Sequence, residues 1–117
     1  MPNDKKIDYV ELHASDFDAA QSFYEKAFEW SFTDYGPEYR SFHDGNLNGG
    51  FYKSELQSTT TNGAALIILY ATNLEQTKER VMFSGGTIVK DIFSFQGGRR
   101  FHFTDPNGNE LAVWSDT

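Results

Sequence analysis

His102 has the clearest potential for chemistry in this sequence, because it is a histidine set between Phe101 and Phe103. A neutral imidazole that faces a cavity can orient a ligand or act as a general base. The alternative is a structural histidine that bonds a backbone carbonyl, and both interpretations stay open. Arg100, two residues earlier, can bind a carboxylate or a phosphate through paired hydrogen bonds, or can simply begin a polar strand.

A second group of reactive side chains alternates along residues 7–13, which we expect to form the first strand. Alternate residues of a strand share a face, so Tyr9, Glu11 and His13 would lie together. A site that uses His102 and Glu11 as its catalytic acid–base residues is therefore one hypothesis. The residues predicted to bind a substrate are Tyr9, His13, Phe51, Arg100 and Trp114.

Aromatic residues make up 16% of the chain, which suits a ligand groove as well as a compact core. Some of them can instead fill the seam between two halves of the fold or between subunits. The aromatic residues that are candidates for a groove wall are Tyr9, Tyr39, Phe51, Tyr70, Phe95 and Trp114.

Composition narrows the class of protein. The 117 residues predict a single domain, 1–117, and the absence of cysteine excludes disulfide and thiolate chemistry. A net charge of −7 argues against nucleic acid as a partner and favours a cationic ligand, although acidic domains are also common for solubility alone. The sequence shows neither a signal peptide nor an apolar run long enough for a membrane span, so we expect a cytoplasmic protein with no membrane partner.

The elements that would position these residues follow a repeated order. A strand over 7–13 leads through Ser15 and Asp16, both good helix caps, into an apolar stripe that predicts a helix over 17–28. Three short strands follow before a polar linker, and the same order then starts again. The later strands are expected over 30–34, 39–43, 49–53, 64–70, 87–89 and onward, 99–104 and 110–114, with a second helix that Asn73 caps and that ends near residue 83.

The second half closes on Asp105-Pro106-Asn107-Gly108, which predicts a tight hairpin turn because proline fixes φ and Asn-Gly tolerates positive φ. This hairpin, the segment 23–30 and the repeated element order together resemble the vicinal-oxygen-chelate superfamily of glyoxalases, bleomycin-resistance proteins and extradiol dioxygenases. The resemblance covers essentially the whole chain. It implies an α+β fold of two tandem βαβββ modules, about 5–54 and 64–116 with a linker at about 55–63, whose curved sheets surround a groove. It also implies a homodimer.

Enzymes of this superfamily hold a divalent ion with His, Glu or Gln on the first and last strand of each module. The corresponding residues here are Tyr9, Phe51, Leu66 and Ala112, with Gly49 as an alternative to Phe51. None of these is a usual metal ligand, so we predict no metal at the standard site and no cofactor. A displaced site remains an alternative, built from Glu11, His13, His102 and Glu110.

Three functions are therefore compatible with the sequence. The first is a metal-independent protein that binds a small, cationic molecule in an aromatic groove. The second is a glyoxalase-like lyase or isomerase that uses a displaced metal or an acid–base site of His102 and Glu11. The third is a non-catalytic, dimeric domain that binds a partner protein.

Overall fold

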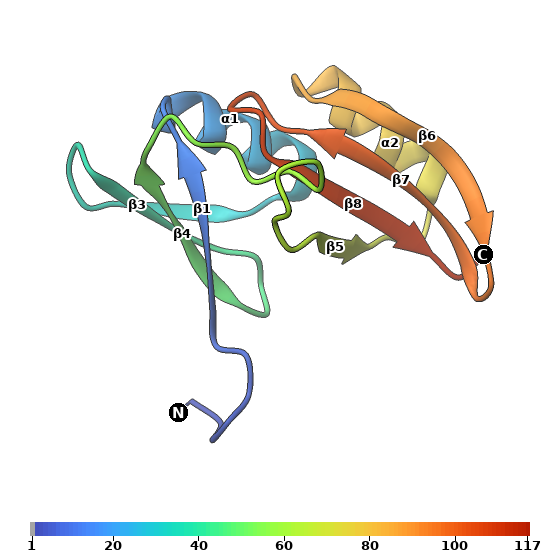
Figure 1. Ribbon diagram of the computed structural model, residues 1–117, viewed down its shortest axis with the longest axis horizontal. Coiled ribbons are helices and arrows are strands. Elements are labelled where there is room, and N and C mark those ends of the chain that lie inside the picture. The colour runs from blue at the N-terminus through green and yellow to red at the C-terminus, as the bar shows by residue number, and fades with distance from the viewer. Residues whose placement is uncertain (1) are drawn as a thin grey trace.

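Each half of the chain forms a four-stranded mixed sheet that carries one helix on one face, as the computed structural model shows for residues 2–117 (Figure 1). The first sheet has the order β1-β4-β3-β2 and the second β5-β8-β7-β6, with β1–β4 and β5–β8 as the parallel pairs. The first module contains β1 (Tyr9–Ala14), α1 (Phe17–Phe28), β2 (Ser31–Asp34), β3 (Tyr39–His43) and β4 (Asn48–Lys53). The second contains β5 (Ile67–Tyr70), α2 (Leu74–Phe83), β6 (Thr87–Phe95), β7 (Gly98–Thr104) and β8 (Glu110–Ser115).

The element order confirms the prediction of two tandem βαβββ modules with curved sheets. The main differences are at strand boundaries. The first strand begins at Tyr9, because Ile7 is 80% exposed and lies outside the sheet. The strand expected from residue 64 begins only at Ile67, since Ala64 instead bonds the carbonyl of Thr59 in the linker.

Both helices begin at the predicted caps. Asp16 accepts a hydrogen bond from the backbone N–H of Ala19, and Asn73 accepts one from the N–H of Gln76. Each side chain satisfies a donor that the first helical turn leaves without an intrahelical partner. The local sequence therefore fixes where each helix starts.

The core lies between the helices and the faces of the sheets that carry them. In β1, Leu12 and Ala14 are buried on this face, and β4 adds Phe51, which pairs with Leu12 and is fully buried. Tyr24 of α1 stacks on Trp30 at 4.4 Å and an angle of 8° between the rings. Much of the aromatic content is therefore used for packing, as the alternative interpretation of these residues allowed.

The predicted hairpin turn also joins the two modules. Gly108 has a φ of 85°, and the Gly108 N–H bonds the Asp105 carbonyl at 2.9 Å, as expected for a tight turn. From this turn Asn107 accepts hydrogen bonds from the backbone N–H groups of Ser15 and Asp16, at the start of α1. The turn of the second module thus holds the strand-to-helix connection of the first.

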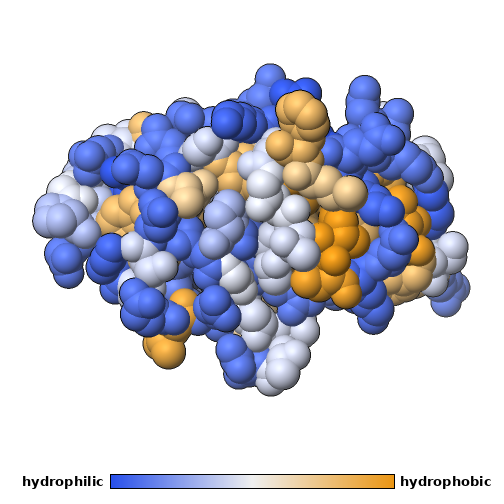
Figure 2. Space-filling view, turned by 90° about the horizontal axis from the view of Figure 1, so that it is seen from above, coloured by the Kyte–Doolittle hydropathy of each residue, from blue (hydrophilic) through white to orange (hydrophobic). Residues whose placement is uncertain are grey.

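The surface seen from above is mainly hydrophilic, and its strongest hydrophobic patch lies toward the end of the molecule that α2 and β6 occupy (Figure 2). Of the helices in residues 2–117, none has the length and apolar character needed to cross a membrane.

Candidate functional site

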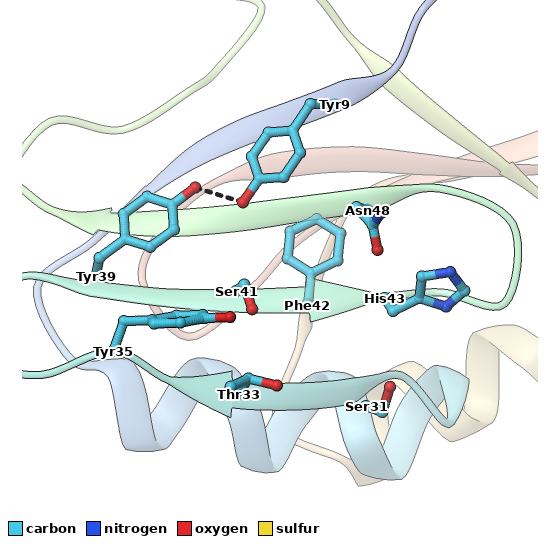
Figure 3. Close-up of a pocket in the computed structure, with 9 residues that line it drawn as sticks. All are labelled: Tyr9, Ser31, Thr33, Tyr35, Tyr39, Ser41, Phe42, His43 and Asn48. Carbon is cyan, nitrogen blue, oxygen red and sulfur yellow. Dashed lines mark hydrogen bonds between the residues drawn. The ribbon is translucent and has the colours of Figure 1, made fainter. Parts of the chain in front are cut away.

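The uncovered face of the first sheet holds a pocket of about 570 Å³, which we call the tyrosine pocket (Figure 3). Strands of a sheet alternate their side chains, so the residues opposite the core point together into solvent. Three tyrosines and several small polar side chains line the hollow, among them Tyr9, Tyr35, Tyr39, Ser41, His43 and Asn48. The hydrogen bonds that link Tyr9 and Glu11 through Tyr39 agree with the prediction that Tyr9 and Glu11 share this face.

A chain of hydrogen bonds crosses this face. The hydroxyl groups of Tyr9 and Tyr39 lie 2.7 Å apart, and the Tyr39 hydroxyl donates to Glu11 at 2.9 Å. An ionised carboxylate only accepts, and Tyr39 has a single hydroxyl proton, so Tyr9 must donate to Tyr39. Burial, followed by the bonds to Tyr9 and Glu11, raises the pKa of Tyr39 well above its ordinary value. The oxygen of Tyr9, at one end of this hydrogen-bond chain, can still accept a hydrogen bond from a ligand.

The position of Tyr39 depends on Gly50 of β4. Gly50 pairs with Glu11 on one side and with Ser41 on the other. A Cβ at Gly50 would overlap the ring and hydroxyl of Tyr39. The glycine therefore makes room for the tyrosine that joins Tyr9 to Glu11.

His13 and Phe51 were also predicted to bind a substrate, and the structure separates them. The ring of His13 packs edge-on against Tyr52 with centroids 4.8 Å apart, on the uncovered face of the first sheet. Phe51 points the other way, into the core, where its ring lies 5.7 Å from Tyr24 and 5.5 Å from Phe42. The expectation that Phe51 lines the groove is therefore wrong, because neighbouring residues of a strand face opposite sides.

His102 lies on the second sheet, where its partner is Glu110. The Nδ1 of His102 is 2.8 Å from a carboxylate oxygen of Glu110, whose other oxygen accepts from the N–H and hydroxyl of Thr60. Burial raises the pKa of Glu110, but the hydrogen bonds from His102 and Thr60 outweigh it and leave the pKa below its ordinary value. A carboxylate only accepts, so the Nδ1 of His102 is the donor in this contact.

The predicted catalytic combination of His102 and Glu11 does not come together. Glu11 bonds Tyr39 on the first sheet, whereas His102 bonds Glu110 on the second. The Nε2 of His102 is also buried without a hydrogen-bond partner in residues 2–117. A ligand can reach this atom only if the side chains that cover it move.

Arg100 and Trp114 lie on the same face of the second sheet as His102 and are direct neighbours in the strand register. The guanidinium of Arg100 lies over the rings of Phe93 and Phe95, 5.3 and 5.7 Å from their centroids. Trp114 packs edge-on against Tyr70 at 5.2 Å. The structure therefore keeps these two predicted residues together, away from the tyrosine pocket.

A second hollow, of about 420 Å³, lies where β1 and the β3–β4 turn meet β5. Its walls are largely apolar, with Val10, Ile67 and Leu69 among them. It offers burial to an apolar group but few polar groups that could orient a reaction.

Comparison with known proteins identifies the fold family. The sequence model of the Glyoxalase/Bleomycin resistance protein/Dioxygenase superfamily matches residues 6–113. The chain belongs to this superfamily. No curated protein matches the sequence significantly.

Solved structures agree with this assignment at the level of the fold. A glyoxalase-related enzyme from Fulvimarina pelagi is similar with a TM-score of 0.79 at 15% identity, covering 95% of this chain and 88% of that one. A genomically encoded fosfomycin resistance protein from Listeria monocytogenes gives 0.79 at 16% identity, covering 97% and 94%. A lactoylglutathione lyase from Agrobacterium tumefaciens gives 0.72 at 21% identity, covering 95% and 93%.

The residues at the superfamily's metal positions do not fit a divalent ion. Tyr9 is hydrogen-bonded to Tyr39, and Ala112 is fully buried beside His102. The metal position on β5 was assigned to Leu66 from the sequence, but the residue of β5 that pairs with Ala112 is Ile68. Either assignment puts an apolar side chain at this position. Across the described part of the chain, no three His, Asp or Glu side chains gather closely enough to hold an ion, which includes the displaced set proposed from the sequence.

Two residues that hydrogen-bond the carboxylates of Glu11 and Glu110 were not predicted as such from the sequence. Tyr39 was expected only as a groove wall, and its bond to Glu11 depends on the space above Gly50. Thr60 lies in a segment that the sequence marks only as a polar linker, yet it holds one oxygen of Glu110. No local pattern signals either contact, because the partners are 28 and 50 residues apart.

Proposed function

We propose that this member of the superfamily binds a small molecule in the tyrosine pocket without a metal ion, and that the ligand carries a positive charge or a hydrogen-bond donor. The observation that supports this most directly is the hydrogen-bond chain from Tyr9 through Tyr39 to Glu11. It starts at Tyr9, which corresponds to a metal-ligand position of the family, and it joins the hydroxyl of Tyr9 on β1 and that of Tyr39 on β3 to a carboxylate. The tyrosine hydroxyls and the carboxylate of Glu11 orient the ligand in place of a metal ion.

The charges and rings of the pocket favour a cation. Tyr9 is exposed and its oxygen can accept a further hydrogen bond, and Glu11 places a negative charge at the other end of the hydrogen-bond chain. Neither lysine nor arginine is among the residues that line the pocket. Aromatic rings attract cations through their negative faces, and the net charge of −7 adds a long-range attraction.

A cationic probe and a neutral analogue of the same shape test this proposal. We expect benzyltrimethylammonium to shift the tyrosine ring resonances in NMR titrations of the EDTA-treated protein, and neopentylbenzene to bind at least about fivefold more weakly, since a cation–π contact contributes roughly 1–2 kcal/mol. Glu11→Gln should weaken binding of the cation by a similar factor. Glu79→Gln, which removes the same charge from the exposed surface of α2, should not.

Two results would contradict the proposal. Equal affinity for the charged and neutral probes would exclude selection of a cation. A stoichiometric divalent ion in elemental analysis of the purified protein, with probe binding lost after its removal, would exclude metal-independent binding.

The second candidate is an acid–base lyase or isomerase, and the contact between His102 and Glu110 is the observation that favours it. A base must reach its substrate, and here the Nε2 of His102 is buried. We therefore favour a structural role in which this pair holds the Thr60 segment to the sheet. Incubation with lactoylglutathione, followed by NMR, tests the enzymatic alternative. Turnover by the wild type that His102→Gln abolishes would favour catalysis over the structural role.

We also propose a homodimer, as the family resemblance implies, and a cytoplasmic location, as the composition suggests. Large apolar side chains that reach the solvent agree with an interface, among them Phe83, which is 96% exposed, and Met82, which is 54% exposed. Light scattering on the purified protein tests this directly. A monomer at all concentrations would contradict the proposal, and a stable complex with another protein would favour the partner-binding alternative.

A further inference from the structure

A row of four side chains crosses the uncovered face of the second sheet, one from each strand. Tyr70 of β5 pairs with Trp114 of β8, Trp114 with Arg100 of β7, and Arg100 with Phe93 of β6. We call these four residues the aromatic row. Their side chains form a surface of planar groups, because laterally paired residues of a sheet point to the same side.

Arg100 is the one arginine that the described residues leave without a polar partner. Arg40 pairs with Asp18, Arg80 bonds the carbonyl of Lys26, and Arg99 pairs with Glu75. In a chain with 17 acidic and 10 basic side chains, an unpaired guanidinium is unexpected. Its Nε is moreover buried with no acceptor in residues 2–117.

The surrounding rings hold Arg100 in place. Its guanidinium lies 5.3 Å from the centroid of Phe93 and 5.7 Å from that of Phe95, so cation–π contacts fix the group without using its hydrogen-bond donors. On the same ring, the ammonium of Lys90 lies 4.7 Å from the Phe93 centroid. Two cations therefore flank one phenyl ring.

Three acidic groups that lie near this row in sequence or on the same sheet are already engaged. Asp116 accepts from the hydroxyl of Tyr70, and Glu110 accepts from His102 and Thr60. Asp91, which neighbours Lys90 in sequence, pairs with Lys78. The two terminal Nη groups of Arg100 are left for an external anion, and a planar guanidinium matches an oxyanion through two parallel hydrogen bonds.

We propose that the aromatic row is a second ligand site, which takes an aromatic compound bearing a carboxylate or a phosphate. Arg100 binds the oxyanion with support from Lys90, and the ring of the ligand packs against Trp114. This site differs in charge and in sheet from the tyrosine pocket, so we expect the two to bind their ligands independently.

Fluorescence of Trp114 reports binding at this site, while Trp30 is buried and supplies a constant background. The probes are 1-naphthoate and 1-naphthyl phosphate as the two kinds of anion, with 1-naphthamide as the neutral analogue. We expect both anions to quench the fluorescence in a saturable way and the amide to bind at least tenfold more weakly. The anion with the higher affinity identifies the preferred oxyanion.

Variants assign the effect to Arg100. Arg100→Gln should weaken naphthoate binding at least tenfold, and Arg100→Lys, which keeps the charge but loses the planar donor pair, should fall between this variant and the wild type. Lys6→Gln is the matched control, because it removes one positive charge from an exposed residue outside the sheets and should leave affinity unchanged. Circular dichroism confirms that each variant is folded.

Two outcomes would overturn the inference: equal affinity for naphthoate and naphthamide, or the same affinity in Arg100→Gln and Lys6→Gln. Two cross-controls distinguish a failure of this inference from a failure of the proposed function. Glu11→Gln should not change naphthoate binding, and Arg100→Gln should not change binding of benzyltrimethylammonium.

Discussion

Asn109 is the residue whose loss should most clearly test how the two modules are joined. Its side chain is fully buried and makes three hydrogen bonds. The amide nitrogen donates to the carbonyl of His13 at 2.7 Å and to Asp105 at 3.2 Å, and the amide oxygen accepts from the N–H of Ser58 at 3.0 Å. One side chain thus joins β1, the linker and the closing turn, and we consider its replacement by alanine.

The expected cost follows from these contacts. A net hydrogen bond contributes roughly 1 kcal/mol, and a buried group left without its partner costs roughly 1–3 kcal/mol. Alanine removes three bonds and leaves the Ser58 N–H and the His13 carbonyl without the partner they have in the wild type. We therefore expect Asn109→Ala to lower the free energy of unfolding by about 3–4 kcal/mol.

Urea and thermal unfolding measure this change. For a domain of this size 1 kcal/mol corresponds to roughly 4 °C, so Tm should fall by about 12–16 °C. Asn62→Ala is the control, because Asn62 is exposed and its side-chain nitrogen makes one bond, at 3.2 Å to Gln57. If the two variants lie within about 1 kcal/mol of each other, the buried contacts do not join the modules as we infer.

Three further predictions concern the first sheet and the carboxylate of Glu110. Phe51→Ala should destabilise by about 3–5 kcal/mol, whereas Tyr52→Ala, on the opposite face of the same strand, should cost about 1 kcal/mol or less in urea unfolding; similar values would contradict the core position of Phe51. Gly50→Ala should displace Tyr39 and weaken binding of benzyltrimethylammonium about fivefold with little change in Tm, and unchanged affinity would count against the hydrogen-bond chain. Because folding lowers the pKa of Glu110, its contribution to stability is present above its ordinary pKa of 4.5 and is lost as the pH falls through the folded value. The stability difference between wild type and Glu110→Gln should therefore shrink from pH 7 to pH 3, and a constant difference would contradict this linkage.

The sequence by itself determined the elements and their order. Asp16 and Asn73 mark the helix starts because a short polar side chain satisfies a free N–H of the first turn. The Asn107-Gly108 pair marks the closing turn because only a residue tolerant of positive φ fits there. These signals act over a few residues, so they can be read without knowing the rest of the fold.

Only the tertiary structure decided which reactive side chains meet. Glu11 and His102 were predicted to act together, but strand register places Glu11 beside Tyr39 and His102 beside Glu110. The face on which Phe51 lies was equally undetermined, since a shift of one residue exchanges the two sides of a strand. Contacts between residues 28 to 50 positions apart depend on how strands pair and where linkers pass, and no local pattern in the sequence records that.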